Sequence, residues 1–188
     1  MTAAPYNTWY DATYDAILTM ADWSKLASDV PKKVTCIYAW MPQTIMNTKH
    51  QGGRPKWVTY SLSDAEQVLK QAEVSFADLA ATQQDLTQFD ISRVEPGLLR
   101  IFQLLFPLFG SVASSKYLHF SAPKLFPMWD RAIRIARGHR DTSQGFLDYM
   151  HQFKKELESQ ENLVEAQKAY PLNPVRGWDI VNMRNRRT

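Results

Sequence analysis

Hydrophobic residues recur at intervals of three or four along most of this chain, the spacing that places them on one face of a helix. Residues 8–29 show it first, and Thr8 belongs to the residue types that cap helix N-termini. The apolar positions are Tyr10, Tyr14, Ile17, Leu18 and Ala21. We therefore expect a helix within residues 8–29.

The same spacing, taken with the capping, proline and glycine residues, predicts further helices. Ser63 and Glu66 have the spacing of a capping box, which would open a helix reaching about Ala72. Residues 34–46 are strongly apolar and fit a buried helix or a strand, and we favour the helix because no clear strand exists to pair with it. Residues 47–57 contain two adjacent glycines and a proline, so they predict a loop. The other expected helices are 75–89, one starting at Pro96, 111–120, 130–137, one or two over 143–170, and a short one after Pro174.

A series of helices without a convincing sheet predicts an all-α protein. The sequence has no internal repeat, low-complexity tract or flexible linker, so we expect one globular unit over residues 1–188. Within it we distinguish an N-terminal helical part at 1–97, a core at 98–140 and C-terminal helices at 141–188.

Composition narrows the class of protein. Hydrophobic residues make up 45% of the chain, enough for a packed interior, yet no apolar stretch approaches the roughly 20 residues of a membrane span. The N-terminus lacks the pattern of a signal peptide. The single cysteine, Cys36, excludes an internal disulfide and a four-cysteine metal site, and its apolar surroundings predict a buried, inert thiol. We expect a cytoplasmic protein without cofactor or membrane partner.

Charge is distributed unevenly between the two halves of the chain. Residues 1–90 hold 7 Lys and Arg against 10 Asp and Glu, whereas residues 91–188 hold 15 against 9. Four arginines recur every three residues in the basic half: Arg131, Arg134, Arg137 and Arg140. This excess favours a polyanionic partner such as DNA, although solvated surface charge would give the same pattern.

One segment, residues 106–137, combines features that could hold a nucleic acid. It predicts two helices joined by a short hairpin at Pro107–Gly110. The start of the second helix would expose unpaired backbone N–H groups to a phosphate. Ser111, Ser114, Ser115 and Lys116 would add side-chain donors near that end. The alternative is a plain helix-packing unit without a ligand.

Asp130 follows a proline-framed loop and heads the next helix. Aspartate is among the best N-cap residues, so capping alone would account for it. A carboxylate beside several arginines could also stabilise a developing cation or orient a water molecule. Both roles are compatible with one position.

Two short runs in this segment resemble the helix-hairpin-helix DNA glycosylases, especially their adenine-specific branch. Residues 106–110, FPLFG, stand where that family has its L-P-G-[VI]-G hairpin, and residues 126–130, FPMWD, are similar to its F-P-x-x-D run, with Asp130 at the matching offset. Leu108 replaces the first hairpin glycine, and Val112 stands where lyase-competent members carry a nucleophilic lysine.

The resemblance implies a two-lobed helical fold and a monofunctional hydrolase that excises a modified or mispaired base, with Asp130 as catalytic residue. The base would be rotated out of the duplex and stacked on an aromatic residue, for which Trp40, Tyr117, Trp129 and Trp178 are candidates. The groups expected to contact DNA are Gly110, Ser111, Ser114, Ser115, Lys116, Lys124, Arg131 and Arg134.

Two other functions fit the same sequence. Leu108 and Val112 favour a nucleic-acid-binding module that has lost catalysis. A helical protein–protein interaction or regulatory protein, in which Asp130 only caps a helix, is the third. His119 lies in the apolar run YLHF, which favours a buried structural histidine, and the histidines have no convincing zinc spacing.

Overall fold

The computed structural model describes residues 8–40, 61–81 and 84–185. Within these ranges every regular element is an α-helix, so the all-α prediction is confirmed. The helices of the first part are α1 (Thr8–Met20), α2 (Val30–Trp40), α4 (Leu62–Ala81), α5 (Ile91–Phe109) and α6 (Ser111–Ser121). Those of the second are α7 (Arg131–Ala136), α8 (Ser143–Leu157), α9 (Gln160–Ala169) and α10 (Pro174–Asn185). The domain division and the two-lobed arrangement stay predictions.

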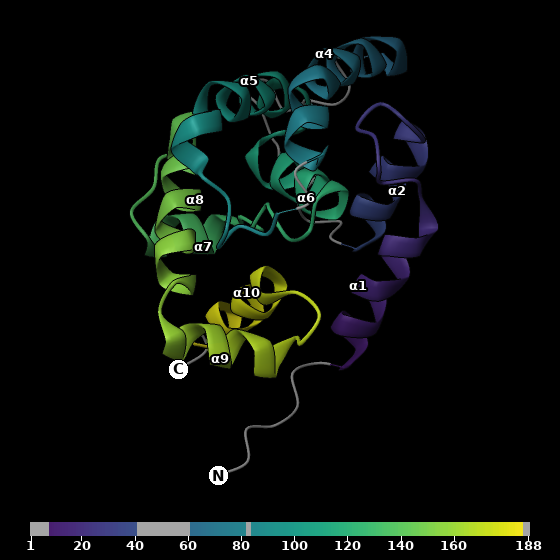
Figure 1. Cartoon of the computed structure of the whole chain (residues 1–188). Helices are drawn as coiled ribbons and strands as arrows, with labels where there is room; N and C mark the ends of the chain where they lie inside the picture. Colours follow the sequence, from purple (N-terminus) through teal and green to yellow (C-terminus); the bar gives the residue numbers. More distant parts are fainter. Residues whose placement is uncertain (1–7, 41–60, 82–83, 186–188) are drawn as a thin grey trace.

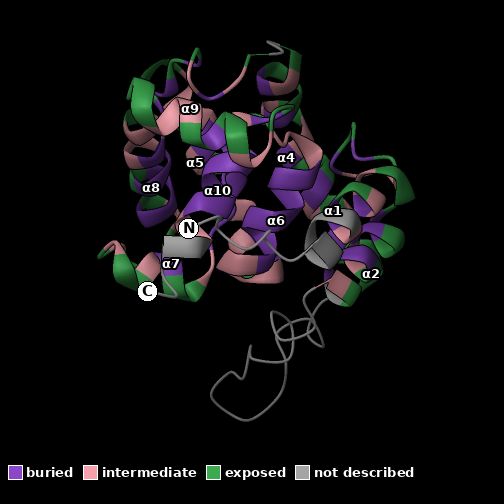
Figure 2. Cartoon of the chain, turned by 90° about the horizontal axis from the view of Figure 1, so that it is seen from below, coloured by how far each residue is buried: buried purple, intermediate pink, exposed green. Residues whose placement is uncertain are grey.

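Helix α6 lies at the centre of the molecule. In Figure 1 the pair α4 and α5 lies above it, α7 and α8 to its left, α9 and α10 below, and α1 and α2 to its right. It packs against α5 and α2, and eight consecutive residues of it, 113–120, are buried. Figure 2 shows α6 and α10 as largely buried helices, with the exposed residues on the surrounding ones. A helix enclosed on all sides must bury whatever polar residues it carries.

The connection between α5 and α6 is tighter than the sequence predicts. Helix α5 starts at Ile91, not Pro96, and continues through Pro107 to Phe109, so the expected four-residue turn shrinks to Gly110. Pro96 and Pro107 both lie on the exposed side of α5. The opposite, apolar face of the helix packs against the core, despite the backbone hydrogen bonds that the two prolines cannot donate. Gly110 has φ 79° and ψ 160°, a backbone conformation that is essentially limited to glycine.

Helix α4 corrects two further predictions. It is one helix over residues 62–81, where the sequence suggested a break near residue 73. Its capping box is formed by Ser61 and Asp64, not by Ser63 and Glu66. Ser61 N donates to Asp64 Oδ2 at 2.9 Å, and Asp64 N donates to Ser61 Oγ at 3.1 Å. Two overlapping serine-acid pairs gave the same signal, and the first of them starts the helix.

The remaining boundaries agree in part with expectation. The first helix ends at Met20, earlier than residue 29. Residues 34–40 are helical, as favoured; the rest of the apolar run and the predicted loop at 47–57 lie outside the described residues. The stretch 143–170 forms the two helices α8 and α9, the pair that the sequence left open. No described helix is long and apolar enough to pass through a membrane.

Helices α9 and α10 cross in close contact at Gly177. A Cβ atom added there would lie 2.0 Å from the carbonyl oxygen of Ala166 and 2.7 Å from its carbonyl carbon, both of them backbone atoms of α9. Because a helix backbone cannot yield as a side-chain tip does, glycine is needed at this crossing.

We expect Gly177→Ala to lower the free energy of unfolding by at least roughly 1–3 kcal/mol, the usual effect of overpacking. Urea unfolding followed by circular dichroism measures it. The matched control is Gly97→Ala in α5, where an added Cβ would meet only Ser75 Cβ, at an ordinary 3.8 Å. Gly97→Ala should leave stability unchanged or raise it by about 0.5–1 kcal/mol through helix propensity. Equal losses in the two variants would contradict this account of the crossing.

Candidate functional site

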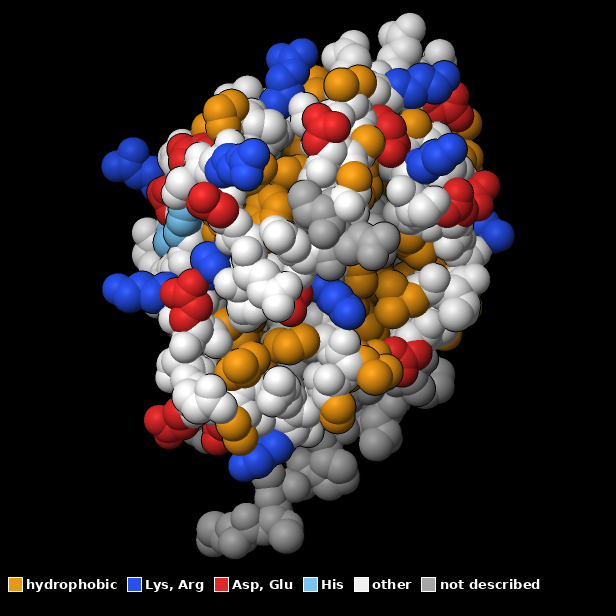
Figure 3. Space-filling model, in the orientation of Figure 1, with side chains coloured by type: hydrophobic (Ala, Val, Ile, Leu, Met, Phe, Trp, Pro, Cys, Tyr) orange, Lys and Arg blue, Asp and Glu red, His pale blue; other side chains and the backbone are white. Residues whose placement is uncertain are grey.

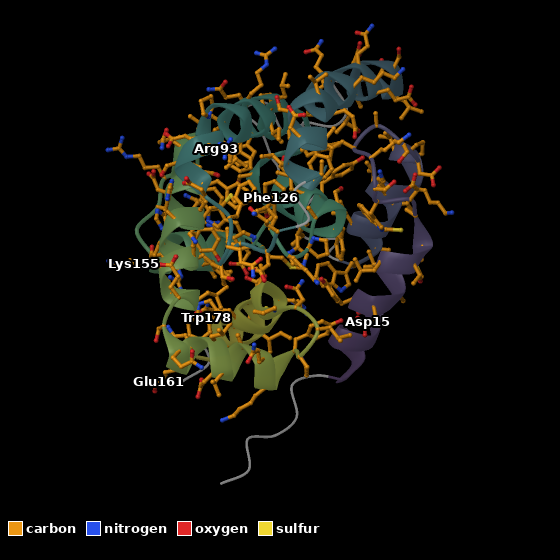
Figure 4. The ribbon with its side chains drawn as sticks, in the orientation of Figure 1. Asp15, Arg93, Phe126, Lys155, Glu161 and Trp178 are labelled. Atoms are coloured by element: carbon orange, nitrogen blue, oxygen red, sulfur yellow. The ribbon has the colours of Figure 1, made fainter. Side chains whose placement is uncertain are left out.

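The chain between α6 and α7, residues 122–130, is called here the Asp130 loop. It passes through the core instead of over the surface, and Figure 4 shows its residue Phe126 in the middle of the molecule. The Phe126 side chain is fully buried, with ring centroids of Phe76 and Phe102 at 6.4 and 6.2 Å. Trp129 is also buried and stacks on Phe146 at 4.9 Å. These contacts leave the loop little freedom to move.

Asp130, the last residue of the loop, is half-buried. Its Oδ1 accepts a hydrogen bond of 2.7 Å from Ile133 N, so the predicted N-cap of α7 is confirmed. The preceding residue, Trp129, is fastened to α6: Ser115 Oγ accepts from Trp129 N at 3.1 Å and lies 3.0 Å from Trp129 O. Ser115, in the second turn of α6, and Asp130 are therefore close together.

Lys116, the residue after Ser115, is buried and lies close enough to Asp130 for their charges to interact. Only 2% of its surface is exposed, and its Nζ lies 5.7 Å from the ring centroid of Trp40. Burial lowers the pKa of the Lys116 amine to about 8, while the negative charge of Asp130 acts in the opposite direction. A lysine in this state supplies neutral amine near physiological pH far more readily than a surface lysine.

Among the four aromatic candidates for base stacking, the structure distinguishes Trp40. It is half-buried at the end of α2 and lies over the Lys116 amine. Trp40 also packs in the fold, with the ring centroids of Tyr14 and Phe120 at 6.2 and 5.2 Å. The other three candidates lie away from the amine or are fixed by their own contacts: Trp129 is enclosed in the core, Tyr117 donates its hydroxyl to Leu26 O at 2.6 Å, and Trp178 Nε1 donates to Glu156 Oε2 at 2.9 Å. We call Lys116, Asp130 and Trp40 together the Lys116 site.

Three of the predicted phosphate ligands are in the wrong place for that role. Ser114 and Ser115 are fully buried, and the hydroxyl of Ser114 donates to Leu105 O at 2.9 Å. Lys116 is buried as well, so these three side chains do not line a surface at the start of α6. The prediction that they are exposed rested on helical spacing alone, whereas α6 is enclosed by neighbouring helices. Gly110 and Ser111 remain half-buried at that end of the helix.

The basic residues expected to contact DNA fall into two groups, exposed ones and ones held in ion pairs. Lys124 and Arg131 are exposed. Arg134 forms an ion pair with Asp141 at 3.6 Å. Arg137 forms a two-pronged pair with Glu156, in which Nη2 donates to Oε2 at 2.8 Å. On the face of the molecule that Figure 3 shows, Lys and Arg side chains are interspersed with Asp and Glu.

A buried polar cluster beside the loop consists of His119, Tyr14 and Arg176. Of these residues, the sequence predicted a buried structural role only for His119. The structural role expected of His119 is confirmed: its Nδ1 lies 2.6 Å from Phe126 O and its Nε2 lies 2.8 Å from Tyr14 Oη. A carbonyl oxygen only accepts, so Nδ1 carries the proton and Nε2 accepts from the tyrosine hydroxyl. Arg176 lies over the Tyr14 ring, with Cζ 4.5 Å from its centroid, and is fully buried.

The sequence carried one weak signal for this cluster: Arg176 and Asp179 stand among the apolar residues Val175, Trp178 and Val181 of the last helix. Cys36 is a buried free thiol, as expected, and burial raises its pKa. No group of three or more His, Cys, Asp or Glu side chains suited to a metal ion is present in the described parts of the chain.

The chain matches no protein-family model, no curated protein and no solved structure.

Proposed function

We propose that this protein is a DNA base glycosylase-like hydrolase in which Asp130 is the catalytic carboxylate. The observation that carries the proposal is the position of Asp130: a partly accessible carboxylate, held in place through Trp129, beside a buried amine and a half-buried indole. An acid and an amine of this kind suit the cleavage of a sugar–base bond, in which positive charge develops on the sugar. The resemblance of residues 106–110 and 126–130 to helix-hairpin-helix glycosylases supports the same reading.

The reaction would proceed at the N-glycosidic bond of a nucleotide rotated out of the duplex. The bond between C1′ and the base nitrogen breaks, and its electron pair leaves with the base. Asp130 stabilises the cationic sugar and accepts a proton from the water whose oxygen adds to C1′. The Lys116 ammonium, with its pKa near 8, is a suitable acid to protonate the departing base. Trp40 offers a face for stacking.

The DNA backbone would lie over the exposed ends of the elements that surround the site. Gly110 and Ser111 present the start of α6, where amide N–H groups favour an anion. Arg131 at the start of α7 and Lys124 in the loop are the exposed cations closest in sequence to Asp130. Binding through such contacts weakens with added salt.

A second candidate uses the amine as the nucleophile. Its burial and lowered pKa favour a role for Lys116 that the sequence assigned to no residue, because Val112 stands at the lysine position of lyase-competent glycosylases. The amine would attack C1′ and displace the base; the opened sugar would then be linked to the enzyme as an imine. Borohydride reduces such an imine to a stable covalent adduct, whereas a water-dependent reaction leaves none.

We expect Asp130→Asn to lower base excision at least roughly 100-fold, the contribution typical of a positioned acid or base, while DNA affinity is retained or raised. A panel of modified duplexes, treated with alkali after incubation, measures excision, and gel shifts at several salt concentrations measure affinity. Asp148→Asn is the control, because Asp148 is exposed on α8 and bonds only to Gln144 among the contacts that the structure shows.

The same assay separates the alternatives. Excision that survives Asp130→Asn would rule out Asp130 as the catalytic carboxylate. Salt-dependent binding without excision by the parent chain would identify a binding module, and neither binding nor excision would favour a protein–protein interaction role. A borohydride-dependent adduct that is absent in Lys116→Met would assign the second candidate.

A further inference from the structure

Both backbone polar groups of Met128, two residues before Asp130, are held by side chains from two other helices. Its N–H donates to Asp179 Oδ2 on α10 at 3.1 Å. Its C=O accepts from the Tyr149 hydroxyl on α8 at 3.2 Å. Asp179 and Tyr149 are buried, with 1% and 0% of their surfaces exposed. The two helices thus hold one residue of the loop by opposite sides of its backbone.

Other backbone groups of the Asp130 loop are held by side chains as well. The N–H and C=O of Trp129 both contact Ser115 Oγ. Further along, Phe126 O is bonded to His119, and Pro123 O accepts from Asn173 Nδ2 at 2.8 Å. Residues 128 and 129, which directly precede Asp130, therefore have all four backbone polar groups in contact with side chains. Most loops satisfy these groups with water at the surface.

Asp179 holds the loop with a buried carboxylate, a group that must be compensated by partners to be stable there. Asp179 is surrounded by protein, and taking its charge out of water is costly even though Arg137 lies within electrostatic reach. A neutral acceptor would satisfy the N–H of Met128 at less cost. A carboxylate that must act on a substrate has to be held within about 0.5 Å of its productive position, and on a loop this depends on supporting side chains.

We propose that Tyr149 and Asp179 are positioning residues for Asp130, which they hold beside Lys116 through the backbone of Met128. The inference rests on the proposed function for the role of Asp130. It does not require either side chain to touch the substrate, and neither is counted as a catalytic residue.

The test compares changes that remove a bond to Met128 with changes that keep it. Tyr149→Phe deletes only the hydroxyl, and Asp179→Leu removes the acceptor. Asp179→Asn keeps an amide oxygen that can still accept from Met128 N, so it should restore function. Tyr170→Phe is the matched control, because the hydroxyl that it deletes bonds Asp15 at an exposed position. If Asp179→Leu fails to fold, Tyr149→Phe still tests the proposal, because it removes the other bond to Met128.

In Tyr149→Phe and Asp179→Leu we expect kcat for excision, per folded molecule, to fall about 10- to 100-fold with KM nearly unchanged, the effect of a displacement near 1 Å. Asp179→Asn and Tyr170→Phe should keep most of the parental kcat. In an Asp130→Asn background, Tyr149→Phe should cause no further loss, because both changes act through the same carboxylate. Undiminished kcat in both Tyr149→Phe and Asp179→Leu, with only a lower unfolding midpoint, would overturn the proposal.

A second readout does not depend on excision. Protein labelled with ¹³C-lysine allows the Lys116 amine to be titrated by NMR through the signal of its Cε. Its midpoint should move in Tyr149→Phe and stay at the parental value in Tyr170→Phe. If the parent chain excises no base from any duplex, the proposed function fails, and this titration alone decides the positioning role. An unchanged Lys116 midpoint in Tyr149→Phe would then refute it.

Discussion

The free energy of unfolding should fall steadily as the pH is lowered below about 6.5, because of His119. Burial lowers the pKa of His119 to about 3; the hydrogen bond to Phe126 O opposes this shift, and the nearby charge of Arg176 adds to it. In the unfolded chain the imidazole takes up a proton near pH 6.5, whereas in the folded protein it stays neutral. The unfolded state therefore binds more protons between these values, so acid favours it. The expected loss is about 1.4 kcal/mol per pH unit, on the order of 5 kcal/mol by pH 3.

Urea unfolding at a series of pH values between 5 and 6.5 checks this prediction. This range lies above the pH at which ordinary carboxylates titrate, so their contribution to the slope is small. His119→Gln is the comparison, since an amide can donate and accept in place of the ring but takes up no proton in this range. The variant is expected to be less stable than the parent at neutral pH, through lost packing. Its dependence on pH should nevertheless be flatter. Equal slopes in the two proteins would show that His119 is not the group responsible.

Replacement of Lys116 by methionine should stabilise the fold at neutral pH by up to about 3 kcal/mol. Burial depresses the pKa of the Lys116 amine from its ordinary 10.5 to about 8, and the attraction of Asp130 offsets only part of this. At pH 7 the lysine is charged in both folded and unfolded states, so the full cost of burying the charge is present. That cost disappears as the pH rises from 8 to 10.5. Methionine has a similar length and no charge to bury.

Lys33→Met is the matched comparison for that variant. Lys33 is fully buried too, and burial likewise lowers its pKa to about 8. Its amine donates to Lys25 O and, at 3.1 Å, to Ser28 Oγ, which fixes the turn before α2. Loss of these bonds costs roughly 1–3 kcal/mol and offsets the gain from removing a buried charge, so Lys33→Met should change stability little or be destabilised. Unfolding midpoints at pH 7 measure both, and a large loss in Lys116→Met would contradict the prediction.

Proteins commonly give up stability for function at their active sites, so a destabilising side chain is a reason to look for function there. Lys116→Met should therefore separate stability from activity: the protein becomes more stable while chemistry at the site is lost. Such a result would support the proposal that the Lys116 site is catalytic. A variant that remained fully active would exclude the amine from the reaction.

Local features of the sequence were enough to predict much of the helical framework. The period of three to four in apolar residues gives the all-α class, because it reflects which face of each helix is buried. The cap at Asp130 and a separate helix over 111–120 were also predicted, since N-cap chemistry and glycine breaks act over only a few residues. Boundaries near prolines were predicted less well: α5 continues through Pro107 because its ring is on the exposed side.

The sequence by itself determined that Asp130 heads a helix a short distance after the start of α6. Only the tertiary structure decided that Ser114, Ser115 and Lys116 point inwards, that Trp40 is the aromatic residue beside the amine, and that Asp179 reaches the loop from 51 positions further along the chain. The physical reason is the enclosure of α6. When neighbours cover a helix on every side, the spacing of its residues no longer tells which of them meet solvent, and the contacts between distant segments settle the matter.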